Sequence, residues 1–140
     1  MLIRFIQAFV AASIVLGLYH LASRLDGVLF PVFTNVQLVS AEQGPRTYTT
    51  ASHMTFFKER DCTFLRSEFF IGNPENGLAV ISEFVKPPEV LTGGDTGHSY
   101  RLVHMPPSAL RKNSYAIAYH DCYDGWLWPT ATTFWNTSRQ

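Results

Sequence analysis

The stretch "SYAIAYHD", Ser114–Asp121, decides the fold class of this 140-residue chain. Its bulky residues occupy every second position, and Ala116, Ala118 and His120 occupy the positions between them. In a β-strand, side chains two positions apart lie on the same face. We therefore predict a strand with two different faces, one of which carries Ala116, Ala118 and His120.

Segments that are similarly rich in β-branched and aromatic residues recur through the chain after residue 33. The predicted strands are Thr34–Ser40, Thr47–Phe57, Cys62–Ile71, Leu78–Val85, His98–Met105, Ser114–Asp121 and Pro129–Trp135. Between them lie sequences with turn chemistry, such as "GNPENG" and "KPPEVLTGGDTG". About seven short strands favour a mainly β fold, a two-sheet sandwich over residues 34–140.

This arrangement resembles an immunoglobulin-like domain in its architecture. The resemblance does not extend to the motifs of that family. The chain has no Trp between its two cysteines, and His120 stands where a tyrosine corner would place a Tyr, two residues before Cys122. We therefore expect an immunoglobulin-like β-sandwich without assigning the chain to a named family.

The opening segment, "MLIRFIQAFVAASIVLGLYHLASRLDG", predicts a membrane anchor. Phe5–Ala22 is almost entirely apolar and would rise about 27 Å as a helix, close to the ~30 Å of a bilayer core. A cleaved signal peptide and a buried helix of a soluble protein are the alternatives. A cut after Ala22 or Ser23 would put His20 or Leu21 where signal peptidases prefer a small residue. We predict an uncleaved anchor over residues 1–24, followed by a juxtamembrane linker over residues 25–33.

The flanking charges and small residues of this segment predict its orientation and its contacts. Arg4 and the short N-terminal tail favour a single-pass protein of the cytoplasmic (inner) membrane, with its N-terminus inside and its C-terminal domain periplasmic or extracellular. Small residues four positions apart allow close helix packing in lipid. Ala8 with Ala12, and Ser13 with Gly17, have this spacing and are the residues predicted for helix packing.

Charge and cysteine content limit the class of protein further. Lys+Arg and Asp+Glu number 11 each, so nothing in the net charge favours a nucleic-acid partner. Charged residues make up 16% and aromatic residues 14% of the chain, which fits membrane-embedded surface and a β-rich core.

Cys62 and Cys122 stand at predicted strand ends. In an exported chain this even count predicts a disulfide.

Three histidines provide the main argument for an enzyme. His98, His104 and His120, with Asp95 or Asp121, would suit a small exported metal-dependent or hydrolytic enzyme. The histidines occur singly, however, and lack the tight spacing of metal-binding motifs. Asp95 also begins an Asp-Thr-Gly triplet, but its Gly-rich surroundings favour a plain turn. We predict no catalytic residue, no metal ligand and no cofactor.

The aromatic tail is the most distinctive surface candidate. Trp126, Trp128, Phe134 and Trp135 lie within ten positions of one another. They are predicted to form an interaction surface of the kind that supplies binding hot spots. The alternatives are that these rings close the sandwich core, or that Trp126 and Trp128 form stacking platforms of a carbohydrate-binding module.

Taken together, these features predict a membrane-tethered, non-enzymatic binding or assembly module. We expect an accessory subunit of a membrane or virion-associated protein complex. Its helix would contact the lipid bilayer, and its domain would contact a protein partner in the membrane or on its outer side.

Overall fold

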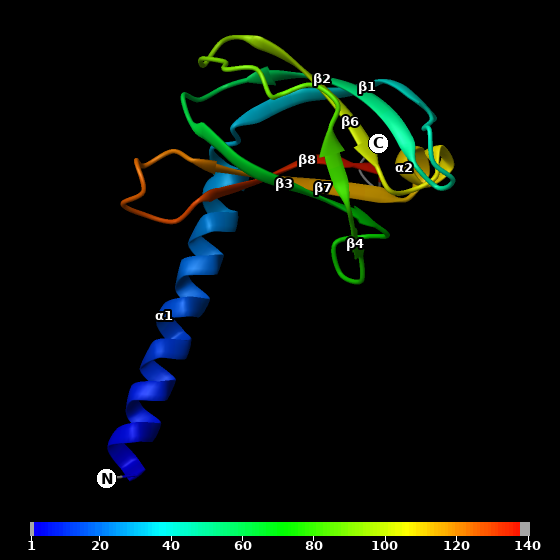
Figure 1. Cartoon of the computed structure of the whole chain (residues 1–140). Coiled ribbons are helices and arrows are strands. Elements are labelled where there is room, and N and C mark those ends of the chain that lie inside the picture. The colour runs from blue at the N-terminus through cyan, green and yellow to red at the C-terminus, as the bar shows by residue number, and fades with distance from the viewer. Residues whose placement is uncertain (1, 138–140) are drawn as a thin grey trace.

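The computed structural model describes residues 2–137 and contains one long helix and two β-sheets (Figure 1). The helices are α1 (Leu2–Leu29) and α2 (Pro107–Lys112). The strands are β1 (Phe33–Gln43), β2 (Thr50–Lys58), β3 (Thr63–Ile71), β4 (Leu78–Val80), β5 (Ser82–Phe84), β6 (Thr96–Val103), β7 (Ser114–Asp121) and β8 (Thr130–Asn136). Residue 1 of the predicted anchor and residues 138–140 of the predicted sandwich lie outside the described residues.

The strands form two antiparallel sheets of four strands each. One sheet has the order β1-β2-β6-β5 and the other has the order β4-β3-β7-β8. Figure 1 shows the two sheets facing each other. The expectation of a mainly β chain with two sheets and an N-terminal apolar helix is confirmed.

The inner face of β7 carries the alternation that the sequence predicts. Ala116, Ala118 and His120 are 0%, 1% and 0% exposed. Ala116 belongs to the core cluster between the sheets, together with the larger side chains of Phe69 and Trp135. Small residues on β7 therefore alternate with bulky ones because the inner face must accommodate large side chains from its neighbours.

The predicted strand Leu78–Val85 is wrong as a single element. β4 pairs with β3 in one sheet, and β5 pairs with β6 in the other. The chain changes sheets at Ile81, whose carbonyl oxygen accepts a hydrogen bond from the backbone nitrogen of His104 at 2.9 Å. Residues 2–137 therefore contain eight strands instead of about seven.

The helix is longer than the predicted anchor. α1 continues to Leu29, so most of the expected linker over residues 25–33 is helical, and β1 begins at Phe33. The two final turns of α1 lie against β8, where Ser23, Asp26 and Gly27 are buried. The structure thus joins helix and sandwich through packed contacts and a short connection.

The rest of α1 is exposed. Every side chain from Ile3 to Leu21 is exposed, and the helix is long and apolar enough to cross a membrane. At a rise of about 1.5 Å per residue, Ile3–Leu21 spans about 28 Å, which matches the ~30 Å of a bilayer core. In Figure 1 this part of α1 projects away from the sheets.

Candidate functional site

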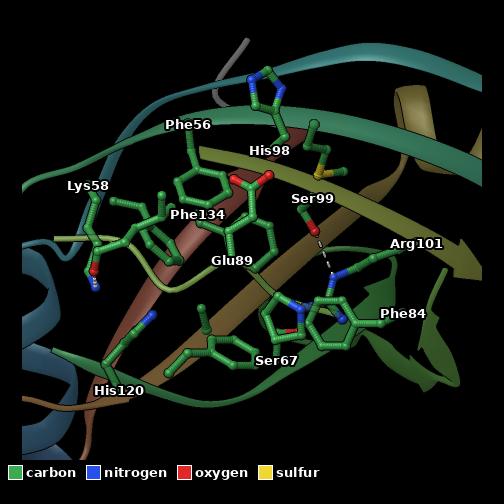
Figure 2. A pocket seen from close by; sticks show the side chains of 16 residues that line it. Phe56, Lys58, Ser67, Phe84, Glu89, His98, Ser99, Arg101, His120 and Phe134 are labelled. Carbon is green, nitrogen blue, oxygen red and sulfur yellow. Dashed lines mark hydrogen bonds between the residues drawn. The ribbon is translucent and has the colours of Figure 1, made fainter. Parts of the chain in front are cut away.

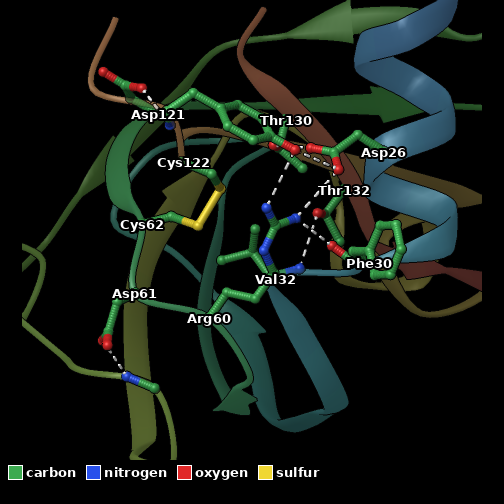
Figure 3. The surroundings of a disulfide bond; sticks show 12 residues. Asp26, Phe30, Val32, Arg60, Asp61, Cys62, Asp121, Cys122, Thr130 and Thr132 are labelled. Carbon is green, nitrogen blue, oxygen red and sulfur yellow. Dashed lines mark hydrogen bonds and ion pairs between the residues drawn. A yellow bond between two sulfur atoms is a disulfide. The ribbon is translucent and has the colours of Figure 1, made fainter. Parts of the chain in front are cut away.

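The carboxylate of Asp26 fastens the end of α1 to the sandwich (Figure 3). It is 8% exposed and accepts hydrogen bonds from the hydroxyl of Thr130 and, at 2.9 Å, from the hydroxyl of Tyr123. Nη1 of Arg60 lies 3.4 Å from the same carboxylate and donates to the carbonyl oxygen of Phe30 at 2.8 Å. The carbonyl end of a helix attracts cations, so Arg60 also complements the helix dipole. Asp26 therefore holds α1 in one orientation relative to the sheets.

Gly27 allows the close approach of α1 to β8. A Cβ atom at this position would lie 1.9 Å from the carbonyl oxygen of Ala131, which is a backbone atom that cannot rotate away. One turn earlier, the hydroxyl of Ser23 donates to the carbonyl oxygen of Pro129. The helix backbone and the β8 backbone are therefore in direct contact at Gly27.

We expect Gly27→Ala to loosen this junction. The added methyl group must push α1 away from β8, and overpacking of this kind costs about 1–3 kcal/mol of folding free energy. The measurement is the spin-label distance distribution between positions 18 and 65, with labels attached by a chemistry that does not use cysteine. It should broaden in Gly27→Ala.

The matched control is Gly17→Ala. Gly17 lies in the same helix, and a Cβ atom there has nothing within 4 Å. Its distance distribution should stay as narrow as that of the wild type. Equal distributions in Gly27→Ala and Gly17→Ala would contradict a junction that depends on backbone contact.

The predicted disulfide is confirmed. Cys62 and Cys122 are bonded to each other, with their Cα atoms 4.4 Å apart. Thr63 pairs with Asp121 in the β3–β7 ladder, so the cysteines extend this ladder by one residue on each strand. The bond links two neighbouring strands of one sheet, close to the Asp26 junction (Figure 3).

The three predicted histidines do not converge. The exposed ring of His98 lies beside that of His53, with ring nitrogens 3.1 Å apart. His104 lies 3.7 Å from a carboxylate oxygen of Glu83. His120 points into the space between the sheets. Within residues 2–137, no group of three or more His, Cys, Asp or Glu side chains is arranged to hold a metal ion.

The two aspartates of the enzyme alternative both stabilise turns. Asp95 accepts hydrogen bonds from the backbone nitrogen and the hydroxyl of Thr92, at 2.9 and 2.8 Å. Asp121 accepts bonds at 3.0 Å from the backbone nitrogens of Tyr123 and Gly125. These bonds lower the pKa of both carboxyl groups because they favour the charged form.

The aromatic tail divides between the core and the surface. Trp135 is 4% exposed, and its Nε1 donates to the hydroxyl of Ser114 at 3.0 Å, so it lies in the core and does not belong to an exposed patch. The half-buried ring of Phe134 packs against this core. Trp128 is half-buried and contacts Tyr123 edge to face. Trp126 is 87% exposed, so of the four predicted interaction residues it alone presents its whole ring to solvent.

The small residues predicted for helix packing lie on the exposed part of α1. Ala8, Ala12, Ser13 and Gly17 are all exposed, and the hydroxyl of Ser13 donates to the carbonyl oxygen of Phe9 at 2.9 Å. The hydroxyl of Ser13 is therefore satisfied within the helix. Association through this face stays a prediction.

A cavity between the sheets is the site that the sequence did not predict (Figure 2). It has a volume of about 60 Å³. Its walls are mainly aromatic and aliphatic, and its polar side chains include two cations, Lys58 and Arg101. The residues that line it are Phe33, Met54, Phe56, Lys58, Phe64, Ser67, Phe84, Pro88, Glu89, Leu91, His98, Ser99, Arg101, Ala118, His120 and Phe134.

The polar groups of this cavity are buried among rings. The guanidinium of Arg101 lies over the ring of Phe84, 3.7 Å from its centre, and burial lowers the pKa of Arg101 to about 10. The imidazole of His120 contacts the rings of Phe33 and Phe64 edge to face. Burial, and then the nearby cations Lys58 and Arg60, lower the pKa of His120 to about 4. His120 is therefore a neutral imidazole near pH 7.

Comparisons with protein-family models, with curated proteins and with solved structures find no match for this chain.

Proposed function

We propose that this chain is a membrane-tethered, non-enzymatic binding or assembly module, an accessory subunit of a membrane or virion-associated complex. The observation that carries the proposal is the junction at Asp26 and Gly27 between an exposed apolar helix and a β-sandwich. A flexible tether would need no such contacts. A buried carboxylate and a backbone contact hold the domain at a set angle to the helix. A fixed angle is needed if the domain is to present one surface to a partner beside the membrane.

The strand order supports an immunoglobulin-like assignment of the domain. Named in chain order as A, B, C, C′, D, E, F and G, the strands form the sheets A-B-E-D and C′-C-F-G. Immunoglobulin constant-type domains have sheets A-B-E-D and C-F-G. The disulfide differs, since it links the ends of strands C and F within one sheet instead of joining the two sheets.

The disulfide also supports an exported domain. Cysteine pairs persist in oxidising compartments and are rare in the cytosol. With Arg4 at the N-terminal end of the apolar helix, this favours an N-terminus inside the cytoplasmic membrane and a domain on its periplasmic or extracellular side.

The loop between β7 and β8 is the proposed contact with a protein partner. Its tip carries Trp126 and Leu127, which are 87% and 49% exposed. Figure 1 shows this loop, in orange, at the end of the sandwich where α1 joins it. Exposed aromatic side chains supply much of the energy of protein interfaces.

Site-specific photocrosslinking in native membranes tests this proposal. We expect a photoreactive benzoyl-phenylalanine in place of Trp126 to form a covalent adduct with another protein. The control is the same substitution of Tyr48, which is 73% exposed and lies in the turn between β1 and β2. Adducts with lipid alone at position 126, or equal protein adducts at both positions, would count against a partner at this loop.

A further inference from the structure

Two cations, Lys58 and Arg101, are buried beside the inter-sheet cavity. Lys58 is 7% exposed and Arg101 is 5% exposed. Nζ of Lys58 donates to the carbonyl oxygens of Cys62, at 3.0 Å, and Leu91. Among residues 2–137, neither cation forms an ion pair with an acidic side chain. The charge of Lys58 acts on the carboxylate of Asp95. Burial of a charge without an opposite charge is costly, so an anion in the cavity would stabilise Arg101.

Arg101 is held in place mainly by neutral groups. Its Nε donates to the hydroxyl of Ser99 at 3.2 Å, and its Nη1 lies 3.4 Å from the hydroxyl of Ser82. The faces of Phe84 and Phe69 lie 3.7 and 5.5 Å from the guanidinium carbon. These contacts orient the guanidinium and leave its positive charge uncompensated. A planar guanidinium binds a carboxylate through two parallel hydrogen bonds.

Two further polar side chains in the cavity wall have no partner among the described residues. Both ring nitrogens of His120 and the hydroxyl of Ser67 are buried and form no hydrogen bond there. His120 is 0% exposed, and Figure 2 shows its ring directed from β7 toward the cavity. Buried polar atoms nearly always have partners, so these atoms also point to a ligand with hydrogen-bonding groups.

The remaining walls favour an apolar ligand body with a single negative charge. Five phenylalanine rings line the cavity: Phe33, Phe56, Phe64, Phe84 and Phe134. Its rim is formed by the exposed residues Pro88 and Glu89 and by the half-buried Leu91. Because the carboxylate of Glu89 also lines the cavity, a ligand with one negative charge is favoured over a polyanion. The cavity volume of about 60 Å³ has room for a small head group, with a chain leaving past the rim.

We propose that this cavity binds the anionic head of a single-chain amphiphile of the fatty-acid class. Its carboxylate binds the guanidinium of Arg101, and the unpartnered side chains of Ser67 and His120 supply further hydrogen bonds. Its apolar chain runs along the phenylalanine rings to the rim at Leu91. This binding goes beyond the proposed function, because it requires no protein partner.

The test uses the full chain in nanodiscs of zwitterionic lipid, with octanoate, octanol, octylammonium and acetate as probes. Binding is measured by equilibrium dialysis, and binding to empty nanodiscs is subtracted. We expect octanoate to bind at least about tenfold more tightly than octanol. One charge-assisted hydrogen bond contributes enough binding free energy for a tenfold change in Kd. Acetate and octylammonium should bind still more weakly than octanol.

Matched variants assign the binding to Arg101. In Arg101→Met the affinity for octanoate should fall about tenfold while that for octanol stays unchanged. Arg66→Met is the control, since Arg66 is exposed and paired with Glu68. If octanoate and octanol bind to the wild type with equal affinity, the proposal is overturned. This comparison does not depend on whether the variants fold. If acetate binds as tightly as octanoate, the ligand needs no apolar chain and the amphiphile proposal is overturned. If folded Arg101→Met keeps the wild-type affinity for octanoate, the role of Arg101 is overturned.

Discussion

Replacement of both cysteines, Cys62→Ala with Cys122→Ala, should lower the free energy of unfolding by about 4 kcal/mol in the chain-entropy model. The disulfide closes a loop with a sequence separation of 60 residues. Without it, the unfolded chain gains the conformational freedom of this loop. A domain of this size has a total stability of about 5–15 kcal/mol, so the double variant should be close to unfolding at elevated temperature.

Chemical denaturation of the full chain in neutral detergent measures this loss. The wild type with a reducing agent is the internal control, since it should reach the same midpoint as the double variant in the absence of that agent. A loss of unfolding free energy below about 1 kcal/mol would mean that residual β3–β7 pairing already restricts the unfolded chain. The stabilising role of the disulfide would then be refuted.

Acidification should destabilise the domain through His120. The pKa of this imidazole is 6.5 when unfolded and about 4 in the folded protein, because burial and the cations Lys58 and Arg60 disfavour its charged form. Between these values the unfolded chain binds more protons, so stability falls as the pH falls. The stability that the neutral imidazole contributes is fully present above pH 6.5 and is lost as the pH approaches 4. Each pKa unit corresponds to about 1.4 kcal/mol, so the loss is on the order of 3 kcal/mol.

The variant His120→Leu isolates this effect from that of the carboxyl groups. Leucine cannot titrate and fits among the rings of Phe33 and Phe64. Above pH 6.5 the difference between the unfolding free energies of wild type and variant should be constant. Below pH 6.5 this difference should change, because acid destabilises the wild type more than the variant. Parallel profiles over the whole range from pH 7 to pH 4 would show that His120 is open to solvent.

The alternation of side chains made the sheets predictable. The two-residue period of Ser114–Asp121 identified the inner face of β7, and the turn sequences located most strand ends. The change of sheet at Ile81 was not predictable, since no glycine or proline interrupts Leu78–Val85. What separates β4 from β5 is pairing with β3 on one side and β6 on the other, which are distant in the chain.

The end of α1 was missed for a similar reason. Asp26 looked like a polar residue at a membrane boundary, and its partners Arg60, Tyr123 and Thr130 lie up to 104 positions away. Local sequence gives no indication of such contacts. The fate of Trp135 was equally undetermined, because only the placement of β8 against β7 decides which of two adjacent rings enters the core.

The cavity, by contrast, had a signal in the sequence. Lys58 has the same strand parity as Met54, and Arg101 has the same parity as Val103, so both cations occupy inward positions of their strands. A charged residue on the apolar face of a predicted strand is unusual and is a reason to look for a site. Sequence alone does not show that the two strands bring these charges to one cavity.

The central proposal, a tethered and exported sandwich, is tested most directly by a non-reducing intact mass of the protein from membranes. Free thiols are alkylated under denaturing conditions before the measurement. The mass of the whole chain without alkylation is the predicted result, since it requires both a retained helix and the Cys62–Cys122 bond. A mass that lacks the first twenty or so residues would mean that the helix is a cleaved signal. Full length with two alkylated cysteines would place the domain in a reducing compartment and contradict the proposed topology.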